Sequence, residues 1–162
     1  MFGMDDVAIA RAIHVLAVVI WIGGVATVTT VILPIARRLD TPAKGFALLQ
    51  AVERRFVWQA RIATLLVAAS GFYMVDRLDI WDRFRTIQFW WMHAMVLLWL
   101  IFSLILFIGE PLVARSRKGL DVPTEPRAGL VRMHWLHWAL LAVSAITVLA
   151  AVAGSQGMSL VP

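Results

Sequence analysis

Four long apolar stretches constrain the fold of this chain more than any other feature of its sequence. They cover approximately residues 7–33, 56–75, 87–108 and 133–154. An α-helix needs ~20 apolar residues to cross about 30 Å of hydrocarbon, and each stretch reaches that length. Apolar residues make up 61% of the 162, more than the roughly 45–50% of a soluble domain. The sequence therefore predicts an all-α integral membrane four-helix bundle, formed as a single transmembrane domain over residues 1–162.

The distribution of basic residues predicts how this bundle is oriented. The expected loops 34–55 and 109–132 hold most of the basic side chains: Arg37, Arg38, Lys44, Arg54, Arg55, Arg115, Arg117, Lys118, Arg127 and Arg132. The opposite side holds only Arg11, Arg77, Arg83 and Arg85. Because basic loops stay in the cytoplasm, both termini should face outward, toward the periplasm if this is a bacterial inner (cytoplasmic) membrane protein.

Charge and cysteine content exclude several classes of protein. The net charge of +5 is explained by the basic loops of a membrane protein in a lipid bilayer. The sequence has no soluble segment in which basic and aromatic residues alternate, so nothing in it indicates nucleic-acid binding. Cysteine is absent, which excludes disulfides, thiolate metal sites, iron–sulfur clusters and covalent c-type haem. Asp5 and Asp6 precede the first apolar stretch, where a cleavable signal peptide has basic residues. We therefore expect the first helix to remain in the mature protein.

His14 and His93 are the most informative polar residues, because each lies inside an apolar stretch. His14 lies one turn beyond Arg11, and His93 follows the start of the third stretch by about two turns, roughly 10 Å. Both are thus expected at a similar depth near the outer side. An ionisable residue in hydrocarbon usually faces a bundle interior, a cavity or a ligand. Two imidazoles at one level can ligate a haem iron or copper, although either histidine could simply hydrogen-bond a neighbouring backbone.

The surroundings expected for this pair would suit haem. Trp21 shares a helical stripe with His14, and Phe89 lies one turn from His93, so a flat macrocycle would meet apolar and aromatic walls. Arg11 and Arg85 lie on the outer side, where haem propionates would point. Gly23 and Gly24 permit either close helix packing or room for a porphyrin.

A second cluster is expected near the inner face. His134 and His137 are three residues apart, so they lie on neighbouring parts of one helical face, a geometry compatible with a second haem or metal site. Arg61 and Glu110 should lie at a similar level. The alternative is an interfacial aromatic belt that includes Trp135 and Trp138.

Methionines offer a competing chemistry. Met92 and Met95 flank His93, and thioethers together with imidazole suit copper(I). Methionine is also a common filler of irregular cores. Copper is therefore the alternative to haem at the His14 and His93 site.

Two stretches resemble a known superfamily of membrane proteins. Residues 12–24, with His14, Trp21 seven positions later and then Gly23 and Gly24, resemble the first helix of CopD-type copper-resistance proteins and HemJ-type protoporphyrinogen oxidases. Pro34 followed by Arg37 is similar to the inner end of that helix. The sequence Trp91-Met92-His93 resembles the third-helix Trp-x-His of the HemJ type. Two residues after this histidine, where the HemJ pattern has Lys, this chain has Met95.

The resemblance implies a b-type haem held between the first and third helices, with His14 as one ligand and His93 as the other. A haem b membrane protein of this kind would pass electrons, for example to quinone or a redox partner protein. If it is an enzyme, it would be a haem-dependent oxidoreductase. The HemJ likeness implies protoporphyrinogen oxidation and the CopD likeness implies copper uptake or tolerance.

Small-residue stretches at residues 68–71 and 150–154 could pack within the bundle or in a homo-oligomer.

Overall fold

The first apolar stretch forms one long helical rod. The structure, a computed structural model, describes residues 2–112 and 126–158. The rod comprises α1 (Phe2–Thr27), the π-helical η1 (Val28–Ile32) and α2 (Leu33–Arg38). Pro34 has no N–H to donate to the carbonyl four residues before it. The wider π turn lies just before this proline, and there the Leu33 N–H donates to the Val28 carbonyl. The rod extends past both ends of the predicted span 7–33.

The second helix, α3 (Pro42–Arg77), is much longer than predicted. Thr41 caps its first turn by accepting a hydrogen bond from the Lys44 N–H at 3.4 Å. The expected loop 34–55, within which Thr41 could cap a short interfacial helix through Arg54, is non-helical only at residues 39–41. The cap at Thr41 is confirmed, but the helix continues without a break into the second apolar stretch. Apolar residues explain the extension, since Leu49 is buried against Leu33 and Leu130.

The remaining helices follow the third and fourth apolar stretches. After the 3-10 turns η2 (Trp81–Arg85) and η3 (Ile87–Phe89), α4 (Trp90–Leu104) continues into the π-helical η4 (Ile105–Gly109). The last helix, α6 (Pro126–Ser155), begins seven residues before the predicted 133. Residues 126–132 are therefore helical instead of part of the expected loop 109–132, whose residues 113–125 lie outside the described residues.

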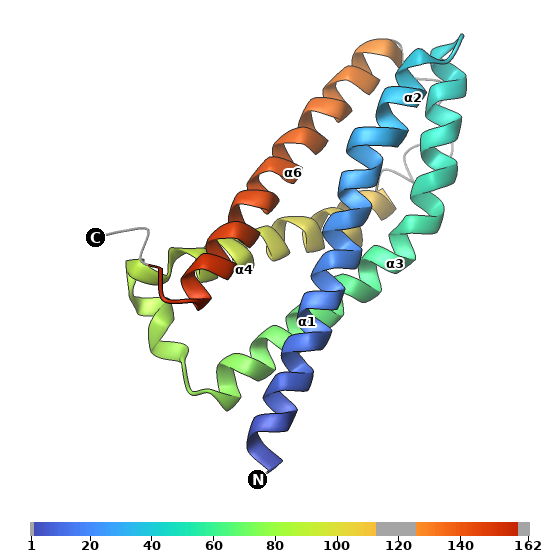
Figure 1. Ribbon diagram of the computed structural model, residues 1–162. Helices are drawn as coiled ribbons and strands as arrows, with labels where there is room; N and C mark the ends of the chain where they lie inside the picture. Colours follow the sequence, from blue (N-terminus) through green and yellow to red (C-terminus); the bar gives the residue numbers. More distant parts are fainter. Residues whose placement is uncertain (1, 113–125, 159–162) are drawn as a thin grey trace.

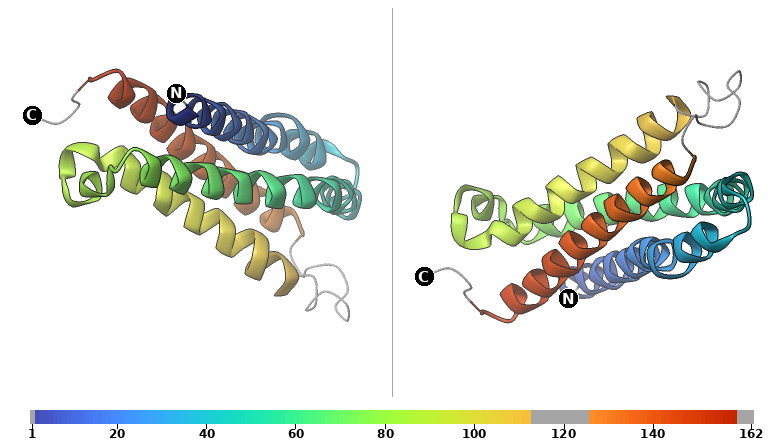
Figure 2. Two further views of the ribbon diagram at one scale, coloured as in Figure 1. Left: turned by 90° about the horizontal axis from the view of Figure 1, so that it is seen from below. Right: turned by 90° about the horizontal axis from the view of Figure 1, so that it is seen from above.

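The helices pack side by side, and their buried apolar side chains form two clusters. α1 lies along α3, and α6 contacts α2 at one end and α4 at the other (Figures 1 and 2). The start of α1 and the end of α6 lie toward the same end of the bundle, opposite the turn at residues 39–41 (Figure 1). The larger cluster joins α1, α3 and α4 through buried side chains: Ala17, Trp21, Ala63, Val67, Leu98 and Phe102.

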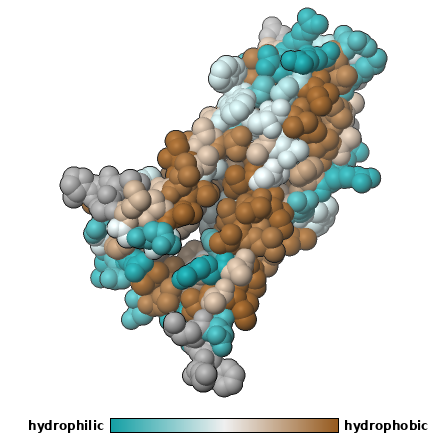
Figure 3. Space-filling view, in the orientation of Figure 1, coloured by the Kyte–Doolittle hydropathy of each residue, from teal (hydrophilic) through white to brown (hydrophobic). Residues whose placement is uncertain are grey.

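Three helical segments are long and apolar enough to cross a membrane. They are Asp5–Arg38, Ile87–Leu112 and Arg127–Ser155. Their apolar side chains cover much of the surface between more hydrophilic ends (Figure 3). The span predicted at residues 56–75 of α3 is not among them, because polar residues dilute its hydropathy: Gln59, Arg61, Thr64 and Ser70.

Candidate functional site

His14 turns from α1 toward α3, and its ring is fixed there by two oxygen atoms. Its Nδ1 lies 3.0 Å from the Val67 carbonyl oxygen and 3.1 Å from Ser70 Oγ. A carbonyl only accepts, so Nδ1 carries the proton. The Ser70 hydroxyl donates to the Leu66 carbonyl and can accept from His14. In the neutral imidazole the lone pair is therefore on Nε2, which has no hydrogen-bond partner among residues 2–112 and 126–158.

A glycine on α3 makes the close approach of His14 feasible. A Cβ atom at Gly71 would lie 3.2 Å from His14 Cε1 and 3.4 Å from Nδ1. Larger residues there would push the imidazole away from Val67 and Ser70. Sequence reasoning noted the small-residue stretch 68–71 only as a packing surface and did not identify these residues as partners of His14.

His93 is exposed and turns toward η2 instead of toward α1. Its Nε2 lies 2.9 Å from the Phe84 carbonyl oxygen, and its Nδ1 lies 3.3 Å from the Phe89 carbonyl oxygen. The ring also packs edge-on against Phe84, with centroids 5.6 Å apart. The shorter contact assigns the proton to Nε2. The structure thus places both nitrogens of His93 against carbonyls, and it does not bring His14 and His93 into contact with each other.

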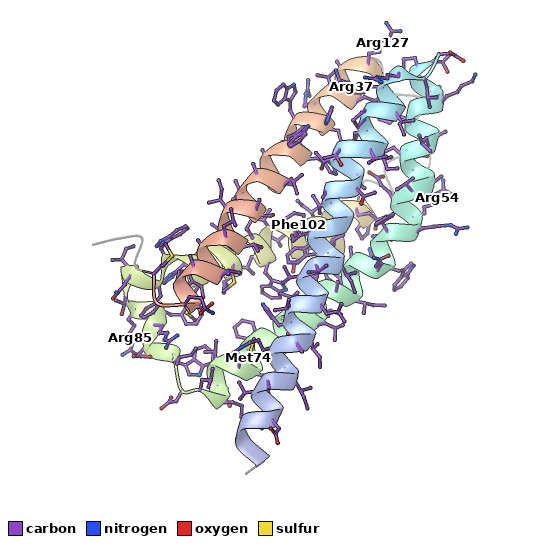
Figure 4. All side chains as sticks on the ribbon, in the orientation of Figure 1. Arg37, Arg54, Met74, Arg85, Phe102 and Arg127 are labelled. Carbon is purple, nitrogen blue, oxygen red and sulfur yellow. The ribbon has the colours of Figure 1, made fainter. Side chains whose placement is uncertain are left out.

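The other residues predicted around the haem lie on different surfaces. Trp21 is buried, packs edge-on against Phe102 at 4.9 Å, and leaves its Nε1 without a hydrogen-bond partner in the described part of the chain. Arg11 lines an open apolar groove of about 510 Å³ along α1. Arg85 is exposed at the end of η2, in the lower part of the bundle (Figure 4).

The predicted inner-face histidines have separate partners. His134 Nδ1 lies 2.7 Å from Arg37 Nη1, and Trp138 Nε1 lies 2.9 Å from His134 Nε2. His137 Nδ1 instead donates to the Met133 carbonyl of its own helix at 2.9 Å. His134 also lines a cavity of about 370 Å³ together with Pro34, Arg37 and Arg38. The two histidines share a helical face but have no common contact in the described residues.

Arg61 and Glu110 lie at one level, as predicted, and form an ion pair of 2.8 Å. Arg61 also donates to the Leu106 carbonyl, at 2.9 Å from Nη2 and 3.2 Å from Nε. Its guanidinium lies 5.3 Å from the ring centroid of Trp58. Leu106 belongs to the π-helical η4, whose wider turn replaces the regular α-helical hydrogen bonds by bonds between residues five apart. Arg61 therefore stabilises this irregular turn and joins α3 to α4.

A polar network at the opposite end joins α1 to α3. Asp6 accepts from Arg77 at 2.7 Å and from the Tyr73 hydroxyl at 2.9 Å. The hydrogen bond to Asp6 raises the pKa of Arg77 above the ordinary arginine value. Sequence reasoning missed this network, although an acidic residue and a basic residue near the same end of two neighbouring helices are a usable signal.

No group of three or more His, Asp or Glu side chains gathers to hold a metal ion in the part of the chain that the structure describes. Met92 is buried and Met95 is half-buried in α4. Haem takes only one or two axial ligands from the protein, so it requires no such group. The haem and copper assignments at His14 and His93 stay predictions.

Comparison with protein-family models, curated protein sequences and solved structures gives no match to this chain.

Proposed function

We propose that this protein is a haem b-binding integral membrane protein with a redox, electron-transferring role. His14 on α1 would be the principal residue to hold the haem, and His93 on α4 the second. The observation that carries the proposal is the arrangement of His14, whose Nδ1–H is held by α3 while Nε2 keeps a free lone pair. Ligating histidines almost always donate their other N–H to a carbonyl or carboxylate in this way.

The residues around His14 fit such a ligand. Val67 and Ser70 fix the tautomer and the ring plane, and Gly71 leaves space for the ring. Trp21, predicted as a wall of the haem site, packs against Phe102, and Arg11 and Arg85 lie on other surfaces, so the proposal rests on His14 and its α3 partners and not on these three residues. Bound haem would supply one-electron chemistry, with its potential tuned by the protein.

His93 fits the role of second ligand only after a change of its ring position. Its Nε2 is 2.9 Å from the Phe84 carbonyl, so coordination through Nε2 requires that hydrogen bond to break. His93 lies at the exposed start of α4, and a ring rotation there would break its contacts with the Phe84 carbonyl and ring. We therefore assign His14 the anchoring role and His93 the exchangeable one.

The membrane topology we propose has four spans, with both termini on the outer side of a bacterial inner membrane. Arg61, the one basic residue within the predicted span of α3, is paired with Glu110 and a backbone carbonyl, which lowers the cost of placing it in hydrocarbon. α3 lies antiparallel along α1, which also supports a span. The basic ends at Arg37, Arg38 and Arg127 would then face the cytoplasm.

The experiment is an absorption spectrum of the detergent-purified protein, oxidised and then reduced with dithionite, with haem and copper measured on the same sample. We expect a sharp reduced b-type band and haem near one equivalent. A colourless protein with stoichiometric copper would favour the copper-handling alternative at Met92 and Met95. Turnover of protoporphyrinogen by the haem-loaded protein would identify the oxidase alternative.

A further inference from the structure

A cavity at the end of the molecule that the proposed topology places on the cytoplasmic side is lined by two arginines and a histidine, with no acidic side chain among the described residues of its lining. It has a volume of about 370 Å³ and is lined by Pro34, Arg37, Arg38 and His134. It lies where α2 runs beside the first turns of α6, close to the labelled Arg37 and Arg127 (Figure 4). Three ion pairs of the described residues join Lys44 to Asp40, Arg61 to Glu110 and Arg77 to Asp6. None of them neutralises Arg37 or Arg38.

The hydrogen-bonding groups around His134 include more donors than acceptors. Arg37 Nη1 lies 2.7 Å from His134 Nδ1, and a guanidinium can only donate. Trp138 Nε1 lies 2.9 Å from His134 Nε2, and an indole N–H can only donate. A neutral imidazole has one acceptor nitrogen, and its other nitrogen is itself a donor. One of these two contacts is therefore between two donors, so the group lacks an acceptor.

An oxyanion in the cavity would supply the missing acceptor. It could accept from Arg37, Arg38 and a protonated His134 Nδ1, which leaves His134 Nε2 to accept from Trp138. Guanidinium groups bind phosphate oxygens through paired, charge-assisted hydrogen bonds. The cavity volume lies in the range of small-ligand sites.

The position of the cavity indicates where such a phosphate comes from. Arg37 and Arg38 end the apolar segment Asp5–Arg38, so they lie at the level of lipid headgroups. The neighbouring Trp135 and Trp138 are 70% and 43% exposed, as expected for side chains at a membrane interface. Basic pockets between helices at the cytoplasmic face suit anionic lipid headgroups.

We propose that the cavity formed by Pro34, Arg37, Arg38 and His134 is a binding site for a phosphate group, supplied by an anionic phospholipid headgroup or by free phosphate. The site is at the opposite end of the bundle from His14 and does not depend on haem.

The test is native mass spectrometry of the full-length detergent-solubilised protein, titrated with phosphatidylglycerol or with zwitterionic phosphatidylcholine. We expect phosphatidylglycerol to bind at least about tenfold more tightly, the scale of one charge-assisted hydrogen bond. The double variant R37Q/R38Q should lose this preference. The control R54Q/R55Q removes the same formal charge from exposed positions on α3 outside the cavity and should keep it.

Inorganic phosphate, added as a competitor, separates the two sources. Phosphatidylglycerol binding that resists phosphate assigns the site to the lipid. Displacement by phosphate, with phosphate binding also lost in R37Q/R38Q, assigns it to the free ion. An unchanged preference in R37Q/R38Q, or an equal loss in R54Q/R55Q, would overturn the proposal.

A second variant changes the number of hydrogen-bond donors around His134 without changing the net charge or removing an arginine. W138F removes the indole N–H, so His134 no longer needs its lone pair on Nε2. It can then adopt the tautomer whose Nδ1 accepts a hydrogen bond from Arg37. We expect phosphatidylglycerol binding to weaken severalfold, with helix content by circular dichroism as the check on folding. Unchanged binding in a folded W138F would contradict the role assigned to His134.

Discussion

The two histidines that the sequence places at a similar membrane depth have very different surroundings. His14 is half-buried between α1 and α3, and one of its ring nitrogens is tied to Val67 and Ser70 while the other is unpaired. His93 is exposed, and both of its ring nitrogens face carbonyl oxygens near η2. Depth along a helix therefore does not decide whether an imidazole can act as a ligand. The neighbouring backbone decides that, because it determines which nitrogen keeps a lone pair.

The largest expected effect separates the two histidines directly. H14A removes the proposed anchoring ligand, and because loss of even a supporting partner costs about 10–100-fold in affinity, we expect essentially no haem in the purified protein. Haem content per protein, measured by extraction, checks this. Wild-type haem content in H14A would disprove the role assigned to His14.

The matching substitution in α4 should have a smaller effect. H93A leaves the His14 ligand in place, so we expect haem to be retained with a shift toward a high-spin spectrum. The oxidised absorption spectrum reports this change. If H93A lost haem as completely as H14A, the two histidines would be equivalent and the difference between their surroundings would carry no functional meaning.

A substitution at Gly71 tests whether the contact between the His14 ring and α3 affects haem binding. G71A places a Cβ atom at 3.2 Å from His14 Cε1, so the ring must move from Val67. We expect haem affinity to fall by less than in H14A, together with a measurable shift in reduction potential. A68G, in the same small-residue stretch, is the control variant, and an effect of the same size there would point to helix packing instead of the ring.

Ser70 should give the smallest change. S70A removes one of two acceptors for the His14 Nδ1–H, a loss of about 1 kcal/mol, while the Val67 carbonyl still holds the ring. We expect normal haem content and a small shift in reduction potential, measured by redox titration. Loss of haem in S70A would show that the hydroxyl, and not the Val67 carbonyl, orients His14.

Sequence predicted the helices better than it predicted their partners. Each of the four apolar stretches lies in a helix, although only three helical segments are apolar enough to cross a membrane. The shared level of Arg61 and Glu110 was correct. The helix bounds were wrong at residues 42–55 and 126–132, because Leu49 and Leu130 bury apolar surface beyond the membrane-length stretches.

The directions of the key side chains could not be predicted from one sequence. The His14 ring turns toward Val67, which is 53 residues away in the sequence. The His93 ring turns toward a 3-10 turn that the apolar pattern did not predict. Both directions depend on how the helices rotate against each other, which periodicity leaves undetermined.

The most direct test of the His14 assignment is the reduced spectrum of the purified wild-type protein beside H14A and H93A, all produced with ample haem. We predict a b-type band in wild type, its loss in H14A and its survival in altered form in H93A. A colourless wild type, or one whose haem is unaffected by H14A, would contradict it.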